Sequence, residues 1–327
     1  MQQKTHLKQY FPCIREKEEI LVQIRENIDL SEKFYHWNKE QRELFLDYCS
    51  GNRGVKVLYD SFFKEVMNAE YEPSRLEDFL STILRKKVKI VRILPNDSTR
   101  VADETMLLIT DIVVELEDGT LANVEIQKIG YLFPGARCAC YSSDLLLRQY
   151  KRIRDRMKDD FSYKNIRNVY LIVLFEKSPS EFKKHPGEYF HYGKVCFNTG
   201  LDIDMLQEYI FVPLDIFKKS KQNKHIDNKM DAWLTFFSED SPERIIELIM
   251  AYPQFQAMYQ TIYDICQNME RMMEMFSKEL REMDRNTEKY MIEEWQRIME
   301  RQEETILKQE EELARYRKLL EEKGIEV

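Results

Sequence analysis

The chain has 327 residues, of which 43% are hydrophobic and 33% are charged. This composition indicates a globular, helix-rich protein, and the presence of only 9 Gly and 9 Pro residues argues against a loop-dominated or an all-β fold. No apolar stretch approaches the roughly 20 residues that a membrane helix needs, and the start, MQQKTHLKQY, lacks the hydrophobic segment of a signal peptide. We therefore expect a cytoplasmic protein with no membrane-bound part.

The cysteines do not form a zinc-binding pattern. Cys138 and Cys140 make a CxC pair, but no second pair lies near them in the sequence, and the histidines are not at zinc-ligand spacing from it. We interpret the cysteines as reduced residues with structural roles.

The first third of the chain reads as helices followed by one strand. Residues 14–48 are expected to form two short helices with a break near Trp37 and Asn38. The segment RLEDFLSTILRK, which follows Pro73, has apolar residues at helical spacing on one face. The alternating segment KVKIVRIL (87–94) ends at a Pro-Asn turn and is predicted to be a strand.

The centre of the chain is predicted to form an antiparallel hairpin. Its strands are MLLITDIVVEL (106–116) and LANVEIQ (121–127), joined by an Asp-Gly turn. Strand interiors disfavour acidic residues, yet Asp111 lies in the first strand, and Glu125 and Gln127 lie in the second.

The elements after the hairpin complete an α/β pattern. A helix is expected to follow Pro134 and to run to about Lys158. VYLIVLF (169–175) is a continuous apolar run, which is typical of a strand buried on both faces, and YIFVPL (209–214) is a further strand. The order helix, three strands, helix, strand predicts a mixed sheet flanked by helices.

From residue 228 onward the pattern is helical, with breaks at Pro242 and Pro253. After Cys266, apolar or uncharged residues recur every three or four positions, as in a coiled coil. This seam comprises Met269, Met273, Phe276, Leu280, Met283, Thr287 and Tyr290 and, after a shift in register, Trp295, Ile298, Gln302, Ile306, Gln309, Leu313, Tyr316 and Leu320. It predicts self-association, most simply as a homodimer; the alternative is a long helix that lies back on its own domain.

The net charge of −8 is unevenly distributed. Residues 268–327 hold 17 acidic and 12 basic residues, a net charge of −5, whereas residues 137–167 hold nine basic and four acidic residues, a net charge of +5. The basic segment is compatible with contacts to DNA phosphates, although a solvated helix face is the alternative. The candidates for DNA contact are Arg148, Lys151, Arg152 and Arg154.

The polar residues of the hairpin fit a metal site. Side chains alternate along a strand, so Glu125 and Gln127 project from one side, and strand pairing can bring Asp111 close to Glu125. Two neighbouring carboxylates repel each other unless a cation lies between them. Mg²⁺ (or Mn²⁺) suits one or two carboxylates and leaves positions for water and phosphate. The alternative is an exposed strand face that carries charged residues.

Taken in order, several stretches resemble the PD-(D/E)XK nuclease family transposases, relatives of the recombination-promoting nucleases of bacteria. The resemblance covers roughly residues 55–215, and the helical tail is also similar. The matching stretches are YDSFFKEVM (59–67), RLEDFLSTIL (75–84), TDIVVELEDG (110–119), ANVEIQ (122–127), RCACYSSDLLLRQYKRI (137–153) and VYLIVLF (169–175).

The resemblance implies a restriction-endonuclease-like fold. Asp111 falls on the family's metal-binding Asp, and Glu125 falls on the (D/E) position. Gln127 falls where the general pattern has Lys. Lysine supplies a positive charge near the attacking water, whereas glutamine has no charge and no titratable group but can orient a water by hydrogen bonds.

Three more residues are candidates through the resemblance. Glu77 matches the helix carboxylate that some nucleases of this fold place near the metal; otherwise it is a surface acid at a helix edge. Arg137 and Tyr141 lie one helical turn apart. The resemblance implies that they support the site or contact phosphate, and the alternative is a buried Tyr141 ring with Arg137 at its rim.

We divide the chain into a helical N-terminal segment (1–54), a nuclease-like core (55–215), a helical region (216–265) and a long helix of coiled-coil type (266–327). We expect a metal-dependent DNA endonuclease that acts in transposition or recombination of mobile DNA. One alternative is a catalytically weak or inactive DNA-binding or assembly protein, because of Gln127. Another is a coiled-coil scaffold that the folded domain anchors.

Overall fold

The computed structural model describes residues 7–94, 112–128, 135–221 and 224–322. The chain forms two compact units, Met1–Glu279 and Leu280–Val327. Within the described ranges, no helix combines the length and apolar character required to cross a membrane.

A six-stranded mixed sheet forms the centre of the first unit. Its spatial order is β1-β2-β3-β4-β6-β5; β3, β4 and β6 are parallel, and the other pairs are antiparallel. This confirms the α/β fold with a mixed sheet. The strands are β1 (Ile90–Leu94), β2 (Ile112–Leu116), β3 (Leu121–Gln127), β4 (Val169–Phe175), β5 (His191–Lys194) and β6 (Gln207–Pro213).

The predicted hairpin is confirmed where the structure describes it. Ile112 pairs with Val124, and the register continues to Glu115 opposite Leu121. Gly119 has a φ of +82°, a conformation that disfavours other residues, and its N–H donates to the Leu116 carbonyl at 2.9 Å. The turn therefore fixes which residues of β2 and β3 pair.

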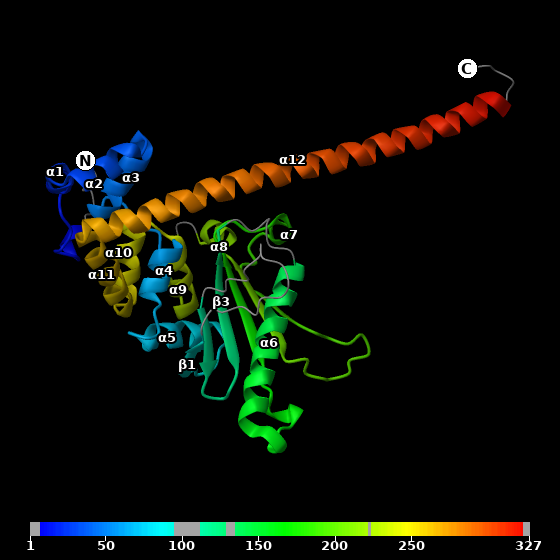
Figure 1. Cartoon of the computed structure of the whole chain (residues 1–327), viewed down its shortest axis with the longest axis horizontal. Coiled ribbons are helices and arrows are strands. Elements are labelled where there is room, and N and C mark those ends of the chain that lie inside the picture. Colours follow the sequence, from blue (N-terminus) through cyan, green and yellow to red (C-terminus); the bar gives the residue numbers. More distant parts are fainter. Residues whose placement is uncertain (1–6, 95–111, 129–134, 222–223, 323–327) are drawn as a thin grey trace. The chain divides into compact units, whose positions relative to one another are not determined.

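Helices cover both faces of the sheet (Figure 1). The helix α6 (Gly135–Met157) runs along one face, where Leu145 packs with Val113, Leu121 and Val169. Residues that point to the opposite face are also buried, Val124 among them. On that side lie α4 (Asp60–Val66), α5 (Pro73–Ile83), α8 (Leu214–Ser220) and α9 (Lys229–Ser238).

The N-terminal segment forms three helices instead of the two that we predict. Asn27 ends the first helix, and its side chain accepts a hydrogen bond from the Leu30 amide at 3.1 Å, so it begins the second. Asn38 begins the third in the same way. These helices are α1 (Lys17–Glu26), α2 (Ile28–His36) and α3 (Lys39–Cys49), preceded by the short η1 (Leu7–Gln9).

The predicted helical breaks at Pro242 and Pro253 are confirmed. Pro242 is the first residue of α10 (Pro242–Ala251), and Pro253 immediately precedes α11 (Gln254–Gln267). Proline suits a helix start because the first amides of a helix lack partners in the helix.

The last helix, α12 (Met269–Glu322), has 54 residues. Its first turns belong to the core of the first unit: Met273 and Phe276 are fully buried, and the Phe276 ring lies 5.0 Å from the Trp37 ring. The early part of the predicted seam therefore lies back on its own domain, and the prediction that it serves self-association is wrong for Met269, Met273 and Phe276. In the second unit, Trp295, Ile298, Ile306 and Leu313 are exposed.

Candidate active site

Glu125 is a buried carboxylate near the carboxyl end of β3. Its relative exposure is 2%, and its Oε1 lies 3.3 Å from the Arg137 guanidinium on α6. Because side chains alternate, Gln127 shares the face of Glu125. The interpretation of this face as an exposed strand surface is therefore wrong, since α6 covers it.

Arg137 connects Glu125 to Tyr141. Its Nε donates to the Tyr141 hydroxyl at 2.7 Å, and its guanidinium carbon lies 5.1 Å from the centre of the Tyr141 ring. The ring is buried, whereas the Arg137 side chain is 36% exposed. Tyr141 thus lies buried with Arg137 at its rim, and the same arginine also holds Glu125.

The thiol of Cys138 lies beside these groups and stays protonated. Burial, and to a smaller extent the Glu125 carboxylate, raise its pKa to about 12 against the lowering effect of Arg137. A neutral buried thiol is a poor nucleophile and a poor metal ligand. Cys138 is therefore part of the packing under the site, as we predict for the cysteines.

Asn123 is a polar residue on this face that the sequence analysis does not identify. It is fully buried two residues before Glu125, and its side-chain amide has no hydrogen-bond partner in the described part of the chain. The signal in the sequence is the alternation of Asn123, Glu125 and Gln127, which indicates one polar stripe along β3.

Glu77 lies at the other end of the hairpin from Glu125. Its Oε1 accepts a hydrogen bond of 2.8 Å from the amide of Ile90, which pairs with Leu116 next to the turn. Glu125 lies four residues beyond Leu121 along β3, which corresponds to ~13 Å. The structure therefore places Glu77 as a support for β1 and does not bring it to Glu125.

Asp111 lies outside the described residues. It directly precedes Ile112, whose register partner Val124 directly precedes Glu125.

The side-chain oxygens near Glu125 show whether a metal ion would suit this site. No group of three or more His, Cys, Asp or Glu side chains that could hold an ion occurs within the described ranges. Glu125 is a buried carboxylate on this face, and Gln127, on the same face, carries an amide oxygen. Mg²⁺ accepts oxygen ligands and needs only one or two carboxylates. Glu125 therefore has the chemistry of one ligand of such an ion.

A family model for PD-(D/E)XK nuclease family transposases matches residues 57–294, which is more than half of the chain. The chain belongs to this family. Searches of curated proteins and of solved structures gave no significant match. Membership confirms the resemblance of the sequence and extends it beyond residue 215 into α12.

The four residues that we predict to contact DNA all lie on α6, carboxyl-terminal to Arg137. Arg148 pairs with Asp144 at 2.8 Å, and Arg152 lies 3.4 Å from Glu115 of β2, so two of the four arginines and lysines have acidic partners. Lys151 and Arg154 are exposed. The exposed positive charge therefore lies mainly at the carboxyl-terminal end of α6.

Lys128 does not take the place of the motif lysine. It directly follows Gln127, and the alternation along the chain directs it to the opposite face. There it forms an ion pair with Glu279, a fully buried residue of α12, whose Oε1 also accepts a hydrogen bond from the Ser61 amide at 3.3 Å. The ion pair therefore links the end of β3 to the amino-terminal part of α12.

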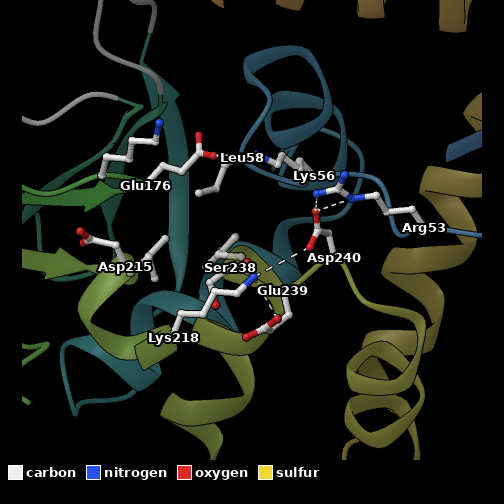
Figure 2. Close-up of a pocket in the computed structure, with 12 residues that line it drawn as sticks. Arg53, Lys56, Leu58, Glu176, Asp215, Lys218, Ser238, Glu239 and Asp240 are labelled. Atoms are coloured by element: carbon white, nitrogen blue, oxygen red, sulfur yellow. Dashed lines mark hydrogen bonds and ion pairs between the residues drawn. The ribbon is translucent and has the colours of Figure 1, made fainter. Parts of the chain in front are cut away.

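A cavity of about 270 Å³ lies where β4 and β6 end (Figure 2). Its charges pair across it: Lys56 lies 2.9 Å from Glu176, and Lys218 lies 3.1 Å from Glu239. Four basic and four acidic side chains line it, so the cavity has no net charge that would select an anion or a cation. These residues are Arg53, Lys56, Lys177, Lys218, Glu176, Asp215, Glu239 and Asp240.

Proposed function

We propose that this protein is a metal-dependent DNA endonuclease that hydrolyses phosphodiester bonds in transposition or recombination of mobile DNA. The observation that carries the proposal is Glu125, a buried carboxylate that Arg137 holds near the end of the motif strand. Burial of a carboxylate is costly. A stable fold would place a hydrophobic residue there, so the cost indicates a functional role in a chain of this family.

In this proposal, Asp111 and Glu125 hold Mg²⁺ or Mn²⁺. The sequence places Asp111 next to Ile112, and the pairing of Ile112 with Val124 supports its approach to Glu125. When bound, such an ion polarises the scissile phosphate and lowers the pKa of a bound water. Arg137 fixes the orientation of the Glu125 carboxylate, and Gln127 orients the attacking water through its amide.

DNA is the proposed substrate, with α6 as the contact surface. Lys151 and Arg154 are exposed and meet phosphates directly. Arg148 and Arg152 are each paired with an acidic side chain, so they add no net positive charge to this surface. In this proposal the protein acts in the cytoplasm, as we expect from the sequence.

Self-association through the second unit completes the proposal. Trp295, Ile298, Ile306 and Leu313 are exposed at successive spacings of three, eight and seven residues, which are close to those of a heptad repeat. Exposed apolar side chains in such a row favour a second helix of the same kind. A homodimer would hold two sites together and so suit the cutting of both DNA strands.

Incubation of purified protein with supercoiled plasmid, with and without Mg²⁺ or Mn²⁺, tests the proposal. Cleavage should require the ion, and Glu125→Gln should lower its rate at least ~100-fold, since even partners of a ligand contribute ~10- to 100-fold. Glu117→Gln is the matched control because Glu117 is an exposed acid in the same hairpin. Cleavage that persists in Glu125→Gln, or without any divalent ion, would contradict the proposal.

A second function is favoured by one observation, the glutamine at position 127. In that case the chain binds DNA and assembles with it but cleaves it weakly or not at all. Binding of duplex DNA by wild-type protein, without cleavage at any ion concentration, distinguishes this function from the first.

A further inference from the structure

Three aromatic side chains form a cluster where α6 ends. Tyr150 lies on the last part of α6, Phe161 follows the short η3 (Lys158–Asp160), and Tyr163 begins η4 (Tyr163–Asn165). The Tyr150 and Tyr163 rings stack at 11°, with centroids 6.1 Å apart, and Phe161 meets both rings edge-on at 5.4 Å. The segment after α6 thus folds back onto the helix.

The stack exposes one ring to solvent. Tyr163 is 73% exposed, although a tyrosine that served only to close the turn would bury its ring. The reversal occurs at Lys158, whose φ of +47° is a left-handed conformation that costs a residue other than glycine ~1–2 kcal/mol. The chain therefore accepts backbone strain in a turn that presents an aromatic face to water.

The surroundings of the exposed ring are basic. Residues 150–167 hold seven basic and three acidic residues, a net charge of +4. Arg154 donates to the Tyr150 hydroxyl at 2.5 Å, and its guanidinium lies 5.7 Å from that ring. An aromatic stack within a positive field matches the chemistry that binds single strands, where bases stack on rings and cations hold the backbone.

We propose that Tyr163, on its stack with Tyr150, is a platform for the unpaired bases of single-stranded DNA. The inference rests on the proposed DNA substrate and adds a site to it. Bases of a duplex are stacked on one another and cannot reach the ring, whereas unpaired bases can. The platform therefore selects single-stranded or opened segments, and Lys151, Arg154 and Lys164 hold their phosphates.

The platform lies at a distance from the candidate active site. Arg137 and Tyr150 are thirteen residues apart on α6, which corresponds to ~20 Å along the helix. At ~3.4 Å per nucleotide of one strand, this distance equals about six nucleotides. An unpaired segment about six nucleotides from the cleavage point would therefore reach the platform while its duplex occupies the active site.

Fluorescence anisotropy of the full-length protein tests the inference with labelled oligothymidine and with a blunt duplex. Tyr163→Ala should weaken binding of oligothymidine ~5- to 150-fold, because base stacking on an aromatic ring contributes ~1–3 kcal/mol, and should leave duplex binding unchanged. Tyr163→Phe keeps the ring and should bind as wild type does. Tyr71→Ala is the matched control, because Tyr71 is 83% exposed between two glutamates.

The outcomes separate this inference from the proposed function. Unchanged oligothymidine affinity in Tyr163→Ala would overturn the platform, as would an equal loss for the duplex, which would indicate a general effect on charge or folding. If wild-type protein binds neither DNA, the proposed substrate itself is wrong. If it binds and cleaves duplex while Tyr163→Ala has no effect, only the platform is refuted.

Discussion

The Arg137 guanidinium lies 3.3 Å from the Glu125 carboxylate and, through its Nε, 2.7 Å from the Tyr141 hydroxyl. One side chain of α6 therefore fixes a carboxylate of β3 and is itself fixed by a buried ring one turn away. This chain of contacts restricts the orientation of the Glu125 carboxylate, which its proposed role as a metal ligand requires.

Arg137→Met should remove this support and leave the helix intact. We expect metal affinity and the cleavage rate to fall ~10- to 100-fold, the usual effect of losing a partner of a metal ligand. Calorimetric titration with Mn²⁺ and plasmid cleavage measure the two quantities. Arg25→Met, at an exposed position of α1, is the control. Equal metal affinity in wild type and Arg137→Met would show that Arg137 serves packing alone.

Gln127→Lys should raise the cleavage rate, because it restores the positive charge of the general motif on the face that carries Glu125. A catalytic proton-transfer or charge contribution is worth ~10²–10⁴ in rate, and we expect ~10-fold or more from a lysine whose surroundings are not adapted to it. Gln127→Met, which has similar length and no polar group, should lower the rate. A slower Gln127→Lys enzyme would mean that this site uses the amide itself.

The hairpin shows how far the sequence determines the site. Alternation alone predicts that Glu125 and Gln127 share a face, and the Asp-Gly turn predicts the register, because both are local properties of the chain. The burial of Glu125 is not local, since it depends on α6 crossing that face. The sequence therefore predicts which side chains of β3 share this face, but it does not predict that α6 covers them.

Contacts between distant segments account for most of what the sequence did not reveal. Glu77 looks like a free acid on a helix, yet it holds the Ile90 amide, thirteen residues away. Lys128 and Glu279 are 151 residues apart. The edge strand β5, of four residues, has no apolar alternation that would mark it. A glutamate or a lysine can have several partners, and an edge strand several neighbours. Only tertiary packing selects one of them.

The Lys128–Glu279 pair should be necessary for stability. Removal of one partner leaves a buried charge without its counterion, so Lys128→Met or Glu279→Leu should each lower the free energy of unfolding by ~3–5 kcal/mol. The double variant Lys128→Met/Glu279→Leu should recover much of that loss. Urea unfolding of the four proteins measures the coupling. Additive losses in the double variant would show that the two side chains act independently.

Alkylation should separate Cys138 from Cys140. The pKa of Cys138 is raised to about 12, so its thiol stays protonated in the folded protein where an unfolded thiol ionises. The buried neutral thiol therefore favours the folded state at a pH below the unfolded pKa of about 9. This stabilisation is lost as the pH rises from about 9 towards 12, because the unfolded thiol then ionises. Iodoacetamide at pH 9 should modify the exposed Cys140 and spare Cys138. Mass spectrometry of the peptides reads the result; equal modification would contradict the burial.

The second unit should be the site of self-association, and point variants test it better than truncation. Removal of everything after Cys266 would also delete buried side chains such as Phe276 and Glu279, and so would damage the first unit. Ile306→Glu and Leu313→Glu change only exposed side chains. Loss of a buried aliphatic contact costs ~1.5–3 kcal/mol, so each substitution should weaken a dimer ~10- to 100-fold.

Sedimentation velocity at micromolar concentration measures this effect. Wild-type protein should sediment as a dimer and the Ile306→Glu/Leu313→Glu double variant as a monomer. Lys308→Glu, at an exposed position of the same helix that lies off the seam, also introduces a glutamate and should leave the dimer intact. A wild-type monomer at this concentration would refute the seam. A dimer that survives both glutamates would place the interface outside residues 306–313.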